Sequence, residues 1–144
     1  MQNKKRTEIL RELSRVSRLS MEAAELVLPS VRDRELRERI ERQMESYRET
    51  AEKSAELLRG YGLAPAEAGG LTRRAVRGSV KLGIARNKSP RRIARIALNG
   101  TAAAMADLAR TMDLSADDDP EGRKLAEKYL DAGQKDIDHL RKYL

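Results

Sequence analysis

The stretch LRERIERQMESYRETAEKSAELLRGYG, residues 36–62, decides the fold of this protein. Its apolar and small residues recur at steps of three and four, which places them on one face of an α-helix, while nearly all the other positions are polar or charged. The stripe consists of Leu36, Ile40, Met44, Tyr47, Ala51, Ala55 and Leu58. Gly60 and Gly62 end it, because glycine readily adopts the left-handed conformation found at helix C-termini. We therefore predict a long helix that buries one face.

Two further signals predict where the first helix ends and this one begins. An apolar stripe of the same period runs from about Lys4 to Leu28, and Pro29 interrupts it. Ser30, with Asp33 three residues later, resembles a capping box and is predicted to start the second helix.

Three more helices follow on the same reasoning. A shorter helix is expected from about Leu71 to Asn87. Ser89 and Pro90 have the residue types of an N-cap and a first helical position, and Asp119 and Pro120 repeat that pattern. With no strand pattern and no internal repeat, the sequence predicts an all-α four-helix bundle with an extra, shorter crossover helix.

Composition supports one helical domain covering residues 1–144. Charged residues make up 37% of the chain and aromatic residues 3%, which is typical of long helices. The chain has no cysteine, so disulfides, thiolate catalysis and zinc–cysteine sites are excluded. No apolar run is long enough to cross a membrane, and no secretion signal is evident at the start. We expect a soluble cytoplasmic protein.

These features together resemble a known superfamily. The glycine-ended second helix, the basic segment after it and the terminal helix LAEKYLDAGQKDIDHLRKYL make the chain similar to ferritin-like proteins, and most similar to small uncharacterised bacterial members that lack the di-metal ligands. The resemblance extends from about Ile9 to the end. It implies a ferritin-like up-down bundle of four helices and a crossover helix.

The sequence lacks the residues of a di-iron site. Such a site needs a Glu from each of two helices and a Glu-x-x-His pair from each of the other two. This chain has a single histidine, His139, which follows Asp136 by three residues. The second helix offers neutral or basic residues at the corresponding level: Gln43, Met44, Tyr47 and Arg48. We expect no cofactor and no enzymatic activity.

A mononuclear metal site is a weaker hypothesis. Asp136 and His139 lie near one face of the last helix, and Asp107 or Glu12 from a neighbouring helix could supply a third ligand. Carboxylate with imidazole suits Zn, Mn or Fe. In the alternative interpretation Asp136 is hydrogen-bonded or paired with a cation, and His139 is half-exposed.

Positive charge is concentrated in residues 73–95. No acidic residue occurs between Glu67 and Asp107, and nine basic residues lie there on a chain of net charge +7, so the remainder carries −2. Such a patch attracts phosphate, which makes nucleic-acid or anion binding an alternative function. Val76, Val80 and Ile84 form only a small apolar face for membrane association. The basic residues are Arg73, Arg74, Arg77, Lys81, Arg86, Lys88, Arg91, Arg92 and Arg95.

The remaining hypothesis, and the one we favour, is a non-catalytic module that binds another protein or itself. The fourth helix carries a row of small residues that permits close helix packing, either inside the bundle or across a homodimer. The row consists of Ala97, Gly100, Ala103 and Ala104.

Overall fold

A computed structural model of the chain describes residues 7–115 and 119–144. Within these ranges the protein is all-helical, with five α-helices, two 3-10 turns and no strand, which confirms the predicted all-α class. None of these helices combines the length and apolar character that crossing a lipid bilayer requires. In chain order the helices are α2 (Glu8–Val27), α3 (Arg34–Gly60), α4 (Gly70–Arg86), α5 (Pro90–Leu114) and α6 (Pro120–Leu140).

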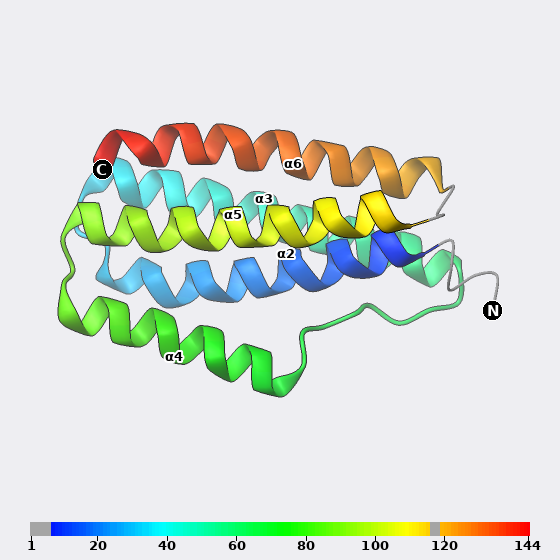
Figure 1. Ribbon diagram of the computed structural model, residues 1–144, viewed down its shortest axis with the longest axis horizontal. Coiled ribbons are helices and arrows are strands. Elements are labelled where there is room, and N and C mark those ends of the chain that lie inside the picture. Colours follow the sequence, from blue (N-terminus) through cyan, green and yellow to red (C-terminus); the bar gives the residue numbers. More distant parts are fainter. Residues whose placement is uncertain (1–6, 116–118) are drawn as a thin grey trace.

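Four of the helices form a bundle, and α4 lies outside it (Figure 1). Helices α2, α3, α6 and α5 surround the interior in that order, and each runs antiparallel to its neighbours. The connection from α3 to α5 spans the length of the bundle and contains α4, which packs against α2 and α5. Because of this crossover, α3 and α5 run parallel.

The positions at which the helices begin contradict one prediction and confirm two. Residues Leu28–Ser30 form a 3-10 turn, and the N-cap of α3 is Asp33, whose carboxylate accepts a hydrogen bond from the Leu36 amide at 2.9 Å. The predicted start at Ser30 was therefore wrong, because Ser30 belongs to the 3-10 turn and residues 31–33 separate that turn from the first residue of α3. The predicted Ser89 and Asp119 caps are confirmed, since both side chains accept from backbone amides of their helices.

The other predicted ends agree with the structure where it describes them. Gly62 has a φ of +76°, so it adopts the left-handed conformation expected after α3. The helix predicted over Leu71–Asn87 is α4. The predicted start of the first helix at Lys4 lies outside the described residues.

The core consists of two apolar clusters along the bundle. One contains Ile40, Ile93 and Leu140 and is closed on its outer side by Val80 and Ile84 of α4. The other is built mainly on Ile9, Leu13, Val16, Leu108 and Tyr129. Both draw on α2, α3, α5 and α6, so each cluster is enclosed by all four helices of the bundle.

Two glycines test whether helix packing or helix propensity sets local stability. A Cβ added at Gly78, on α4, would meet no atom within 4 Å, whereas one added at Gly133, on α6, would lie 2.7 Å from the Met105 sulfur. We expect Gly78→Ala to raise the free energy of unfolding by about 1 kcal/mol through helix propensity. Gly133→Ala should lower it by about 1 kcal/mol or more through overpacking. Urea unfolding measures both, and equal effects would contradict the close approach at Gly133.

Candidate functional site

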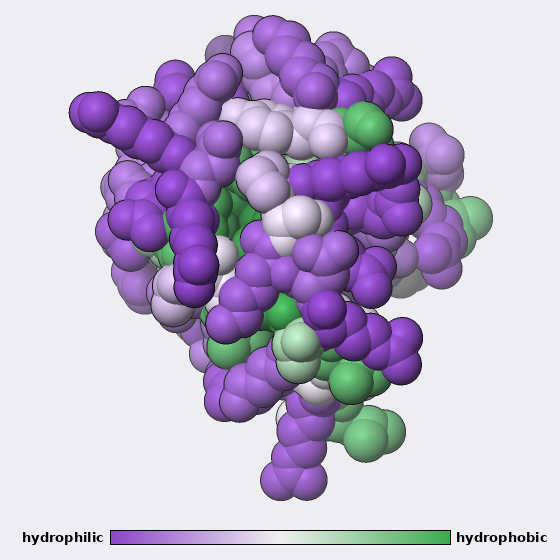
Figure 2. All heavy atoms as spheres, turned by 90° about the vertical axis from the view of Figure 1, so that its left-hand side faces the viewer, coloured by the Kyte–Doolittle hydropathy of each residue, from purple (hydrophilic) through white to green (hydrophobic). Residues whose placement is uncertain are grey.

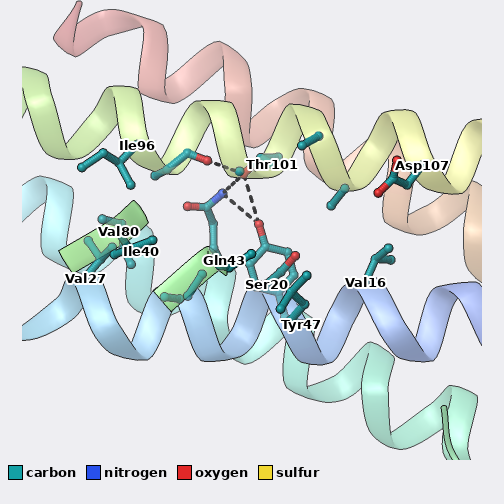
Figure 3. A pocket seen from close by; sticks show the side chains of 18 of the residues that line it. Val16, Ser20, Val27, Ile40, Gln43, Tyr47, Val80, Ile96, Thr101 and Asp107 are labelled. Atoms are coloured by element: carbon teal, nitrogen blue, oxygen red, sulfur yellow. Dashed lines mark hydrogen bonds between the residues drawn. The ribbon is translucent and has the colours of Figure 1, made fainter. Parts of the chain in front are cut away.

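A layer of hydrogen-bonded polar side chains crosses the middle of the bundle. Gln43 and Tyr47 come from α3 and Thr101 from α5, and all three are buried. The Gln43 amide donates to the Tyr47 hydroxyl at 3.4 Å and to Thr101 Oγ1 at 3.5 Å, and the two hydroxyls lie 3.2 Å apart. Thr101 donates in turn to the Ala97 carbonyl at 2.9 Å. Tyr47 therefore donates to Thr101, and each hydrogen in the layer has an acceptor (Figure 3).

A second tyrosine continues the layer towards α6. The rings of Tyr47 and Tyr129 are tilted, with their centroids 6.0 Å apart, and the Tyr129 hydroxyl lies 3.3 Å from the Ser20 hydroxyl. Burial raises the pKa of Tyr47 to about 12 and the pKa of Tyr129 further still. Both phenols therefore keep their protons at neutral pH and provide hydrogen bonds rather than charge.

Asp136 is half-buried on α6, and its charge acts on Tyr47 and Tyr129 of this layer. Burial raises its pKa above the ordinary value, while the Gln43 amide and the charges of Arg39 and His139 oppose part of that rise. An amide that faces a carboxylate presents its NH2 group to it. Asp136 therefore helps to orient the Gln43 side chain with its nitrogen towards the bundle interior. This agrees with the interpretation of Asp136 as a hydrogen-bonded residue.

The candidate metal ligands do not converge. Asp107 on α5 pairs with Arg15 at 3.3 Å and with Arg110 at 3.0 Å, and Glu12 also pairs with Arg15. Across residues 7–115 and 119–144, no group of three His, Asp, Glu or Cys side chains is placed to hold a metal ion. Asp136 and His139 thus share α6 without a third ligand from this part of the chain.

A cavity of about 290 Å³ opens beside the polar layer, between α2, α4 and α5, with α3 as its floor (Figure 3). Its walls are largely aliphatic, and its polar lining comes from Gln43, Tyr47 and Thr101 of the layer together with Ser20 and Thr72. Asp107 and Arg15 lie at one end. The small residues Ala97, Gly100, Ala103 and Ala104 also line the cavity. Sequence reasoning did not anticipate the cavity.

The predicted basic residues lie on α4, on the first part of α5 and, for Lys88, in the connection between them. Eight of the nine are exposed, and Arg92 is partly buried. Arg73 is the one member that forms an ion pair within the described part of the chain, to Glu22 at 2.7 Å. The structure therefore gathers the segment on one side of the bundle and leaves most of its charge facing solvent.

The outer face of α4 is apolar as well as basic. Leu71 and Leu82 are 84% and 60% exposed, while Val80 and Ile84 are buried on the opposite side of the helix. Figure 2 shows hydrophobic atoms among hydrophilic side chains in the lower part of the molecule, on the side that α4 occupies. Sequence reasoning identified only the inner face with Val80 and Ile84. The eleven-residue spacing of the two leucines was the signal that could have revealed the outer one.

Comparison with known proteins finds no family model that matches this sequence, and no curated protein or solved structure that is significantly similar to it.

The raised pKa of Asp136 predicts a pH-dependent stability. A carboxyl whose pKa is higher in the folded state favours folding when protonated, and that contribution is lost as pH rises from its ordinary pKa through the folded-state value. Asp136→Asn removes this loss. The Tm of the variant should therefore match that of the parent at acid pH and exceed it at pH 7.

Thermal unfolding followed by circular dichroism across pH measures this difference. The matched control is Asp138→Asn, an exposed neighbour on the same helix, which should change stability by less than about 0.5 kcal/mol. An Asp136→Asn variant with a Tm at or below that of the parent at pH 7 would show that its ionic contacts outweigh its burial.

Proposed function

We propose that this protein is a non-catalytic helical bundle that acts as a protein-interaction module through the outer face of α4. The observation that carries the proposal is the exposure of Leu71 and Leu82 on a helix whose cations, apart from Arg73, form no ion pair within residues 7–115 and 119–144. The partner that fits this surface is an acidic amphipathic helix. We further propose that the bundle is ferritin-like, which is supported by the crossover from α3 to the parallel helix α5.

The two leucines belong to one stripe. Residues eleven positions apart differ by about 20° around a helix of 3.6 residues per turn, so Leu71 and Leu82 point the same way. Ala75, Gly78 and Ala85 fall within about 40° of the same direction on this spacing, and all three are exposed. Between its two large side chains the stripe carries only small residues, so the surface there is narrow and nearly flat. A partner helix can lie across it and place apolar side chains against the leucines.

Charge defines the chemistry of the partner. Arg74 and Lys81 border the stripe on one side and Arg86 on the other, and all three are exposed. No acidic residue occurs between Glu67 and Asp107 to neutralise them. The positive electrostatic potential of this surface attracts an acidic partner. It therefore raises the association rate of that partner and disfavours the binding of basic proteins.

Nucleic acid is the competing partner for the basic segment 73–95. Phosphate groups would be attracted to the same cations, but they need no apolar stripe. The segment also contains no aromatic residue on which bases could stack. The leucines therefore distinguish the two partners, because only a protein partner depends on them.

The first experiment measures binding to a labelled helical peptide with leucine on one face and glutamate on the other, by fluorescence anisotropy. Leu71→Ser combined with Leu82→Ser should raise the Kd at least tenfold, since burying one leucine contributes about 1.5–3 kcal/mol. The matched control is Leu114→Ser, which removes a leucine that is 80% exposed at the far end of α5. It should change the Kd less than twofold.

Three outcomes would overturn this proposal. The parent could show no saturable binding to the peptide, or the leucine variant could bind as tightly as the parent. A DNA duplex could also bind tightly at about 50 mM salt, with an affinity that is the same for the leucine variant as for the parent and that falls steeply as the salt concentration rises. That last result would establish the nucleic-acid function instead.

The second experiment reverses charge at the border of the stripe. Arg74→Glu combined with Lys81→Glu should weaken peptide binding at least tenfold at about 50 mM salt, with a smaller effect at high salt because exposed charges are screened. The control is a single Arg34→Glu on α3, a residue whose side chain is 93% exposed and belongs to a different helix. Equal weakening by both variants would indicate attraction by net charge alone.

A further inference from the structure

We propose that the cavity between α2, α4 and α5 is a binding site for a small, neutral, mostly apolar molecule that carries one hydroxyl group. The hydroxyl donates to the side-chain oxygen of Gln43. This proposal concerns the interior of the bundle and does not depend on the partner proposed for the outer face of α4.

The size and walls of the cavity define most of the ligand. A cavity of about 150 Å³ with apolar walls stays dry and admits benzene, and this one, at about 290 Å³, is roughly twice as large. Beyond the central layer the polar lining comes from Ser20, Thr72, Arg15 and Asp107, of which the last two pair with each other. A fused two-ring or medium-chain molecule suits this volume. The aliphatic walls are Val16, Leu19, Val27, Ile40, Val80 and Ile96.

Gln43 provides the polar part of the site. The residue is 4% exposed, and its amide nitrogen already donates to Tyr47 and Thr101. Within residues 7–115 and 119–144, no group donates to its carbonyl oxygen Oε1. Figure 3 shows this oxygen directed away from the polar layer, towards the apolar end of the cavity. A ligand hydroxyl would supply the donor that the described residues do not give to this oxygen.

The directions of the hydrogen bonds in the polar layer favour a ligand group that donates a hydrogen bond over one that accepts it. Tyr47 donates to Thr101 and Thr101 to a backbone carbonyl, so neither hydroxyl has a hydrogen left for a ligand. The Gln43 oxygen is therefore the group in this layer that is available to a ligand, and it accepts. Rotation of the amide would place its oxygen against Asp136, which opposes that rotation.

The surroundings favour a neutral ligand over a charged one. A carboxylate would face the Gln43 carbonyl oxygen, and the cation at the rim, Arg15, is already paired with Glu12 and Asp107. An ammonium group would lose its hydration among aliphatic walls, with Asp107 engaged by Arg15 and Arg110. A hydroxyl carries a hydrogen to Gln43 without these costs.

The experiment compares three probes of similar shape by isothermal titration calorimetry on the whole chain. These are 2-naphthol, naphthalene, and 2-methoxynaphthalene, in which the oxygen has no hydrogen. We expect 2-naphthol to bind once per chain and at least tenfold more tightly than the other two, since a buried hydrogen bond of this kind is worth about a factor of ten. Absence of saturable binding by 2-naphthol, or equal binding of 2-methoxynaphthalene, would overturn the proposal without any variant.

Two variants locate the site. Gln43→Leu should remove the preference for 2-naphthol while naphthalene still binds, and retention of the preference would refute the role of Gln43. Gly100→Leu should weaken both ligands at least tenfold, because Gly100 lines the cavity and a side chain there meets no atom within 4 Å. Its control is Gly60→Leu, which has equal space outside the cavity. Unchanged binding by Gly100→Leu would place the ligand elsewhere.

Discussion

The buried amide of Gln43 is the constraint on which the interior of this bundle depends. It lies among aliphatic side chains, where a polar group without partners costs about 1–3 kcal/mol. Tyr47, one turn further along α3, and Thr101 on α5 supply acceptors for its NH2 group. Since α3 and α5 lie diagonally across the bundle, these bonds set their rotation relative to each other. A rotation of α3 by one residue would direct the amide away from Thr101.

The same layer sets the chemistry that the interior offers. Burial keeps Tyr47 and Tyr129 protonated, and Gln43, Thr101 and Ser20 are neutral, so this region exchanges hydrogen bonds and carries no charge. Asp136 remains at the edge, where burial raises its pKa and Arg39 and His139 moderate that rise. Such an interior is suited to distinguishing neutral molecules by their donors and acceptors.

The helices were predictable because each has its own local signal, whereas the site was not. Periodicity located α4, and the side chains of Ser89 and Asp119 marked two helix starts. The stripe of α3 was predicted around Met44, yet Gln43 beside it is the more deeply buried residue. Its burial depends on Thr101, 58 residues away in the chain, and no local pattern reports that bond. The cavity likewise arises from how α4 rests across α2 and α5, which is a property of the packing.

The two proposed binding sites meet in α4 but depend on opposite faces of it. Val76 and Val80 contribute to the cavity wall, while Leu71 and Leu82 point outwards. Only Val80 and Ile84 of this helix are buried, so α4 is held by less apolar surface than the four bundle helices. A molecule that fills the cavity would add contacts to Val76 and Val80 and thereby fix the helix that carries the outer stripe. The leucines themselves make no contact with such a ligand, so occupancy of the cavity can affect partner binding only through the position of α4.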